Sequence, residues 1–155
     1  MLPFFEYLQN TGFTNVVQSS WWMGAAFNVS HLLALVVFMG ALVMVDLRLM
    51  GMGLSDEPLS RVAREAHPWL VAGFMALVIT GIPQFVSLAI RNYYNFFFWV
   101  KMTALVVAVL YTFVLRPKVV AANEHELQGT ARLVGFGSFV LWSGIGIVSR
   151  MIGLS

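Results

Sequence analysis

Residues 23–45 read MGAAFNVSHLLALVVFMGALVMV, and His31 is the only ionisable side chain among them. A helix of this length rises by about 1.5 Å per residue, enough to cross the roughly 30 Å hydrocarbon core of a bilayer. Three more apolar runs follow, at residues 69–90, 96–115 and 133–152. We therefore expect an all-α integral membrane protein, an antiparallel bundle of four transmembrane helices that forms a single domain over residues 1–155.

The composition supports this class and excludes others. Of the 155 residues, 59% are hydrophobic and only 10% are charged, too few to cover the surface of a soluble domain. The chain has no cysteine, which excludes disulfides, thiolate metal sites and iron–sulfur clusters. The nine Lys and Arg residues are scattered, so we expect no nucleic-acid partner. No phosphate-binding loop or nucleophile motif is present, and we assign no catalytic residue.

The segments outside the four runs carry interface and turn signals. Residues 1–22 lack the basic leader and cleavage site of a signal peptide, and their aromatic residues predict an interfacial helix. Residues 51–58 are typical of a turn, after which residues 59–66 could form one or two helical turns. Residues 91–95 predict a tight hairpin. Pro117 is expected to end the third span, with Arg116 and Lys118 in the lipid headgroups.

Positive charge in short loops predicts the orientation. Six cations lie in or beside the loops that join spans 1–2 and 3–4, and three lie towards the opposite side. The first set is Arg48, Arg61, Arg64, Arg116, Lys118 and Arg132, and the second is Arg91, Lys101 and Arg150. We therefore expect a multi-pass membrane protein with both termini outside the cytoplasm.

Ionisable side chains inside a span are costly and indicate a functional site. His31 lies about 12 Å below the outer start of its span and Lys101 about 8 Å below its own, so the two share a layer. The antiparallel spans bring further polar, small or helix-breaking residues to that layer, namely Thr80, Gly81, Pro83, Gln84, Ser143, Gly144 and Gly146. Pro83 is expected to kink its helix, and the two glycines to let a flat group or a neighbouring backbone approach.

This layer predicts a heme b site. His31 would bind the heme iron, because without cysteine an imidazole is the natural ligand. Lys101 would be the second axial ligand if it lost its proton, or would pair with a heme propionate. Met102 lies about 100° around the helix from Lys101, so at most one of the two faces the site. The predicted cofactor-binding residues are His31, Lys101, Met102, Gln84, Ser143, Gly144 and Gly146.

Two short motifs also carry a resemblance. The runs NVSHLL at residues 28–33 and FWVKM at 98–102 resemble the paired His and Lys signatures of HemJ-type protoporphyrinogen oxidases and of CopD membrane domains. Most of the chain also resembles an uncharacterised bacterial four-helix inner-membrane family. The runs at residues 45–51 and 68–74 carry this resemblance. The resemblance implies a His31 and Lys101 pair with b-type heme. The chain has Tyr111-Thr112-Phe113 where those oxidases tend to carry a Tyr-His pair.

Other interpretations of single residues stay open. His31 could be a packing histidine, and Lys101 could extend to the headgroups. His67 and His125 are expected to be an interfacial and a loop residue, or else to hold a second heme together. Asp46 and Arg48 predict an anchor with partners on other helices or in the 1–2 loop. The nine Met residues, which are not clustered, fit core packing better than copper capture.

The sequence thus predicts a heme b-binding membrane protein that acts as a small cytochrome-like electron-transfer or membrane-anchor subunit of a larger complex. Its partners would be other membrane subunits, a periplasmic redox protein or a quinone. A cofactor-free structural or assembly subunit is the first alternative. A HemJ-like porphyrinogen oxidase is the second.

Overall fold

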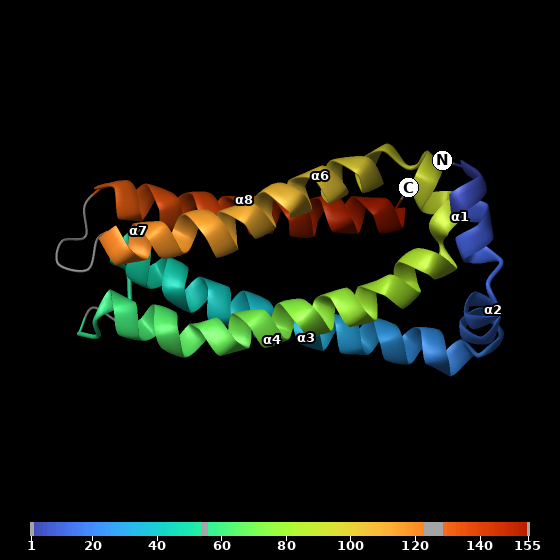
Figure 1. Ribbon diagram of the computed structural model, residues 1–155, viewed down its shortest axis with the longest axis horizontal. Coiled ribbons are helices and arrows are strands. Elements are labelled where there is room, and N and C mark those ends of the chain that lie inside the picture. The colour runs from blue at the N-terminus through green and yellow to red at the C-terminus, as the bar shows by residue number, and fades with distance from the viewer. Residues whose placement is uncertain (1, 54–55, 123–128, 155) are drawn as a thin grey trace.

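A computed structural model describes residues 2–53, 56–122 and 129–154, and all regular structure in these ranges is helical. Four stretches are long and apolar enough to span a membrane. Three of them are the helices α3 (Trp21–Met50), α4 (Leu59–Ser87) and α8 (Gly129–Leu154). The remaining stretch is one continuous helical run made of α6 (Phe96–Leu110), η1 (Tyr111–Leu115) and α7 (Arg116–Ala122). They run antiparallel in chain order (Figure 1). The protein is therefore a multi-pass, four-helix membrane bundle, as predicted.

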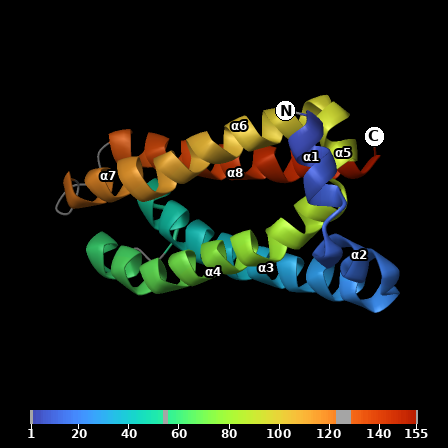
Figure 2. The ribbon, with the colours of Figure 1, turned by 45° about the vertical axis from the view of Figure 1, so that its right-hand side comes forward.

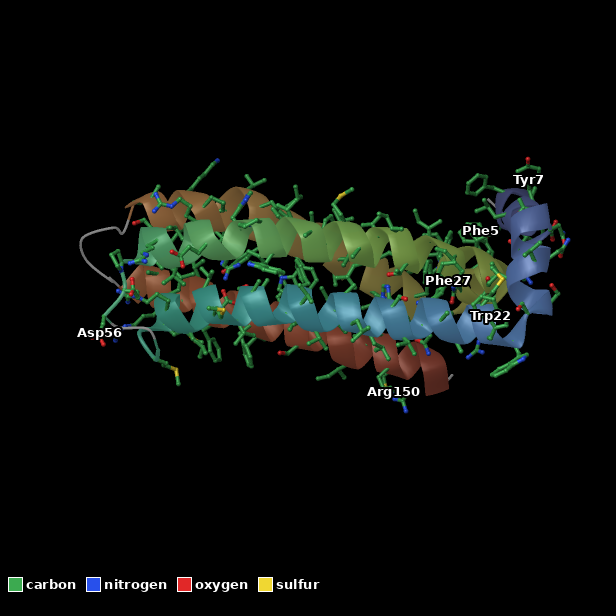
Figure 3. All side chains as sticks on the ribbon, turned by 90° about the horizontal axis from the view of Figure 1, so that it is seen from below. Phe5, Tyr7, Trp22, Phe27, Asp56 and Arg150 are labelled. Atoms are coloured by element: carbon green, nitrogen blue, oxygen red, sulfur yellow. The ribbon has the colours of Figure 1, made fainter. Side chains whose placement is uncertain are left out.

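The two ends of the bundle differ. Both termini lie at one end, here called the terminal end, and the α3–α4 connection lies at the other, the loop end (Figure 1). Residues 1–22 form two short helices rather than one, α1 (Leu2–Gln9) and α2 (Gly12–Ser19). Phe5 of α1 packs on Phe85, Tyr93 and Trp99, which fastens α1 to the bundle. Figure 3 shows Phe5 and Tyr7 at the terminal end and Asp56 at the loop end.

One predicted connection is wrong. The expected hairpin at residues 91–95 is instead a short helix, α5 (Ala89–Tyr94), and Asn95 then caps α6 by accepting a hydrogen bond from the Phe97 amide at 3.0 Å. The helical turns expected at 59–66 are confirmed, and they join α4, which continues through Pro68. The C-terminal part of α4, which contains Pro83, bends towards α5 (Figure 2). The helices of the first, third and fourth spans extend beyond their apolar runs, whereas α4 begins before residue 69 but ends at Ser87.

Pro117 does not end the third span, contrary to the sequence-based expectation. The preceding turn, η1, is a π-helix in which the Arg116 amide donates to the Tyr111 carbonyl, five residues back. This wider turn changes the hydrogen-bond register just before Pro117, which has no amide hydrogen to donate. The helix therefore continues through Pro117 to Ala122. The inserted turn also rotates Arg116 into the protein, where it is 3% exposed.

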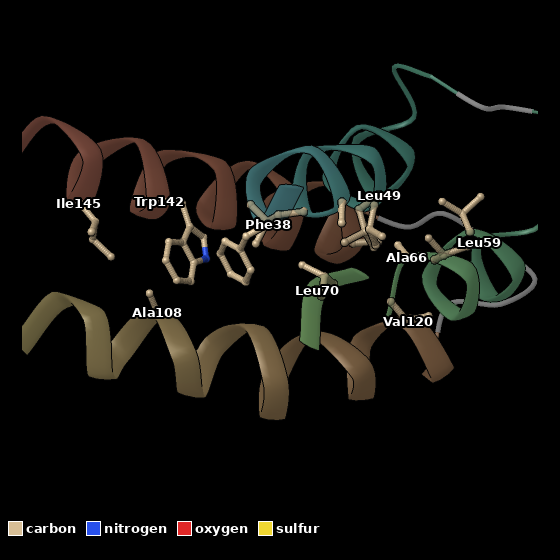
Figure 4. Close-up of a cluster of buried hydrophobic side chains, with 14 residues drawn as sticks. Phe38, Leu49, Leu59, Ala66, Leu70, Ala108, Val120, Trp142 and Ile145 are labelled. Atoms are coloured by element: carbon tan, nitrogen blue, oxygen red, sulfur yellow. The ribbon is translucent and has the colours of Figure 1, made fainter. Parts of the chain in front are cut away.

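The hydrophobic core is concentrated between the middle of the bundle and the loop end. Helix α3 packs against α4 and α8, and α8 packs against α6. Phe38 and Trp142 meet edge to face with ring centroids 4.7 Å apart, and Leu42, Leu49 and Leu59 are almost fully buried (Figure 4). Gly73 lets α4 reach α3 closely, since a Cβ there would lie 2.9 Å from Phe38 Cα. On α3, burial begins only at Ala34, so the terminal half is more loosely packed.

Candidate functional site

His31 lies on α3 and faces α4. Its Nδ1 is 2.9 Å from the hydroxyl oxygen of Thr80. The Thr80 hydroxyl donates to the Ala76 carbonyl at 2.6 Å, which uses its single hydrogen. With that hydrogen used, we assign the Thr80 oxygen as the acceptor from His31, which puts the proton of the neutral imidazole on Nδ1. This tautomer leaves a lone pair on Nε2, the atom that a metal would bind.

Two further residues of α4, Gly81 and Gln84, complete the wall around His31. Gly81 provides room for the ring, because a Cβ at this position would lie 3.3 Å from His31 Cε1. Gln84 donates its amide hydrogen to the Phe27 carbonyl of α3 at 3.2 Å. Gln84 therefore fixes α4 against α3 beside His31, and its role is to position the helices.

Lys101 lies on α6, across the bundle from this wall. It is half-buried, and its positive charge acts electrostatically on His31, so the two side chains share one region of the bundle. Among the described residues, no hydrogen bond or ion pair is formed by its ammonium. Within the described part of the chain, the terminal half thus contains a partly buried cation without a protein counter-ion. We refer to His31, Thr80, Gly81, Gln84 and Lys101 as the His31 layer.

The other predicted site residues are less closely associated with this layer. Met102 is 39% exposed, so Lys101 and not Met102 is directed towards the bundle interior. Ser143 and Gly144 are half-buried and Gly146 is exposed. A Cβ at Gly144 or Gly146 would meet no described atom within 4 Å, so no neighbouring backbone packs on either glycine. The open space beside them leaves room for another group.

The remaining histidines do not extend the layer. His67 is exposed on α4 near the loop end. His125 lies outside the described residues. In the described ranges no three His, Asp or Glu side chains cluster closely enough to hold a metal ion. Heme iron needs only one or two axial ligands from the protein. A single imidazole such as that of His31, binding through Nε2, would therefore be enough.

A second polar site, missed in the sequence, lies near the loop end. Arg116 Nη2 is 2.7 Å from Asp46 Oδ1 and also donates to the Leu42 carbonyl at 2.8 Å. The Asp46 side chain is completely buried, and the buried Ser138 lies beside it. The expectation that Arg116 stays in the headgroups is therefore wrong. We call Asp46, Arg116 and Ser138 the buried ion-pair cluster.

Helix α8 closes over this cluster. Gly135 is essential to the approach, because a Cβ there would lie 2.9 Å from the Asp46 carbonyl oxygen. The Tyr111 hydroxyl donates to the Val134 carbonyl at 2.9 Å, which fixes η1 to α8. The predicted partners of Asp46 and Arg48 are confirmed in outline. Asp46 pairs across helices, and Arg48 Nε donates to the Glu57 carbonyl of the α3–α4 connection at 2.8 Å.

The depth argument used for His31 and Lys101 would have found this pair. Asp46 and Arg116 each directly follow the apolar run of one of two helices that run in the same direction. They therefore lie at similar depth and have opposite charges. The signal was overlooked because Pro117 suggested that the third helix had already ended.

Comparisons with known proteins define the family but not the chemistry. No curated protein and no solved structure matches the chain. One family model, described as a family of unknown function, matches residues 4–155, which includes all four spans. A match over nearly the whole chain assigns the family, so this four-helix membrane protein belongs to the DUF6644 family of unknown function.

Proposed function

We propose that the protein binds heme b in the His31 layer and serves as a small electron-transfer or membrane-anchor subunit of a larger membrane complex. The observation that carries the proposal is the contact between His31 Nδ1 and the Thr80 hydroxyl. The His31 Nδ1–H is directed to Thr80, whose own hydrogen bonds to Ala76, so the Nε2 lone pair is available to iron. A histidine oriented through Nδ1 in this way has the arrangement expected of an axial ligand.

Lys101 supports the same proposal. An ammonium group without a counter-ion in the bundle is unfavourable, and a heme propionate would supply the missing negative charge. A deprotonated Lys101 would instead be a second axial ligand. When bound, heme would supply reversible one-electron transfer. The protein's own contribution would be to orient the imidazole through Thr80, leave space at Gly81 and balance charge with Lys101.

The proposed setting follows from the loop charges. We propose a bacterial inner membrane with both termini on the periplasmic side, which places the His31 layer nearer that side. An electron donor would then be a quinone or a periplasmic redox protein, and the acceptor another subunit. The location of both termini at one end of the bundle is consistent with this orientation.

The test is an absorption spectrum of protein purified from heme-replete membranes. We expect a Soret band from one heme per chain, absent in His31→Ala and retained in the matched variant His67→Ala, which removes an exposed histidine. His125→Ala tests the second-heme alternative. A wild-type protein without a Soret band would reject the proposal.

A cofactor-free assembly subunit is the second candidate. It is favoured by the Thr80 contact itself, since a packing histidine also needs one satisfied hydrogen bond. This function predicts no heme and no spectral change in any variant. HemJ-like porphyrinogen oxidation would use the same His31 and Lys101 pair. Restoration of heme synthesis in cells without their own oxidase would support it.

A further inference from the structure

A groove runs along the outside of the α3–α4 pair, from the loop end towards the middle of the bundle. Its volume is about 450 Å³, within the range of about 300–1,000 Å³ that small-ligand pockets occupy. Small or branched buried side chains form its floor, namely Ala41, Val62 and Ala66. The walls are exposed apolar side chains, namely Val37, Met44 and Trp69. Of this apolar lining, Val37, Ala41 and Met44 lie within the predicted span at 23–45, and Trp69 begins the predicted span at 69–90.

The mouth of the groove carries an alternating set of charges. Arg61, Glu65 and Trp69 recur every four residues of α4 and so share one face, and Glu57, in the connection before α4, lies beside Arg61. Arg61 contacts Glu57 at 3.1 Å and Glu65 at 3.0 Å. All three side chains are about half or more exposed. Exposed pairs of this kind contribute little to stability and exchange readily for other charged partners.

We propose that this groove binds one phospholipid whose headgroup carries both a phosphate and a primary ammonium, as phosphatidylethanolamine does. The acyl chain would lie along Val37, Ala41 and Met44, and the headgroup would lie at the charged mouth. Two carboxylates accept hydrogen bonds from the ammonium, while Arg61 donates to the phosphate.

The charge balance at the mouth selects this class of lipid. Two glutamates and one arginine give the mouth a net negative charge, which disfavours a lipid whose headgroup is only anionic, such as phosphatidylglycerol. Phosphatidylcholine has the same two charges as phosphatidylethanolamine, but its quaternary ammonium has no hydrogen to donate. Trp69 lies where aromatic residues commonly mark the boundary between headgroups and hydrocarbon.

The test is native mass spectrometry of the detergent-purified protein after addition of an equimolar mixture of dioleoyl phosphatidylethanolamine, phosphatidylcholine and phosphatidylglycerol. We expect one retained phosphatidylethanolamine per chain. The double variant Glu57→Gln/Glu65→Gln should lower its retention about tenfold relative to phosphatidylcholine, because neutral amide oxygens accept from the ammonium more weakly than carboxylates do. The matched control Glu6→Gln/Asp56→Asn also replaces two exposed acids, but outside the groove, and should leave retention unchanged.

Three results would overturn the proposal. They are equal retention of the three lipids, preferential retention of phosphatidylglycerol, and unchanged selectivity in the Glu57→Gln/Glu65→Gln variant. A dimer that retains no lipid would instead assign the groove to a second copy of the chain. The result does not depend on heme, because heme content is read from the spectrum of the same sample.

Discussion

The buried ion-pair cluster and the His31 layer place charge inside the same bundle in opposite ways. At the loop end, Asp46 and Arg116 lie 2.7 Å apart and helix α8 seals them from solvent and lipid. In the terminal half, Lys101 has no counter-ion among the described residues, and His31 leaves Nε2 available. A buried pair whose opposite charges cancel favours a structural role, whereas a layer with an unbalanced charge indicates a site that binds another group. We therefore expect the buried ion-pair cluster to contribute mainly to stability and the His31 layer mainly to function.

Breaking the ion pair should have the largest effect on folding. Asp46→Ala leaves the Arg116 guanidinium buried and unpaired, and we expect a loss of about 3–5 kcal/mol in the free energy of unfolding. Thermal or chemical unfolding in detergent measures this. The double variant Asp46→Leu/Arg116→Met removes both charges and should recover most of the loss. If Asp46→Ala proved as stable as the wild type, the cluster would not be the structural centre of the loop end.

Glycine-to-alanine substitutions should destabilise the protein at closely packed positions and leave it stable at open ones. Gly73→Ala and Gly135→Ala force a methyl group against backbone atoms at 2.9 Å, and each should cost about 1–3 kcal/mol. Gly144→Ala and Gly146→Ala add a methyl group in open space and should be neutral, or stabilising by up to about 1 kcal/mol through helix propensity.

The same unfolding assay compares all four glycine variants. Equal destabilisation at the two pairs of positions would contradict the difference in packing. A loss of heme in Gly144→Ala without a loss of stability would instead extend the His31 layer to α8.

Thr80→Val should affect the His31 layer without disturbing the loop end. Valine keeps the shape of threonine but cannot accept the Nδ1–H hydrogen bond, so the imidazole loses its orientation. We expect heme affinity to fall about 10- to 100-fold, as for other residues that orient a metal ligand, with only about 1 kcal/mol lost in stability. Heme titration followed at the Soret band measures the affinity. The control Thr103→Val removes an exposed threonine on α6 and should change neither quantity.

Lys101→Met should have the smallest effect on stability and sharpens the contrast with Asp46→Ala. Removing a cation that has no described counter-ion should leave the heme-free protein unchanged or stabilise it by about 1 kcal/mol. In heme-loaded protein the same change should weaken binding or alter the spectrum. Marked destabilisation of the heme-free protein would show that Lys101 has a structural partner.

Much of the bundle was predictable because each span is a property of a continuous segment. The run at residues 23–45 needs no other part of the chain to indicate a membrane helix, and the same is true of the other three runs. Errors came where a local signal competed with tertiary contacts. Pro117 indicated a helix end, but the helix continues because a π-turn precedes the proline. That turn is held against α8 by the Tyr111 hydrogen bond. The segment at 91–95 indicated a hairpin, but packing with α1 supports a helix there.

The candidate site was predictable to a similar extent. Hydropathy and depth alone selected His31 and Lys101, because an ionisable group in an apolar run stands out without any knowledge of its neighbours. Depth does not specify which face of a helix a residue occupies. The orientation of Met102 towards the outside, and the contact between His31 and Thr80, could therefore not be derived from spacing.

The sequence by itself determined the class of protein, the four spans and the residues whose burial is costly, since hydrophobicity and charge are properties of the residues and of their order. Only the tertiary structure decided which costly residues are compensated. Compensation depends on contacts between helices distant in the chain: Asp46 with Arg116, His31 with Thr80, and no described partner for Lys101. Those contacts depend on helix rotation and close approach, which are set by the π-turn before Arg116 and by Gly73 and Gly135.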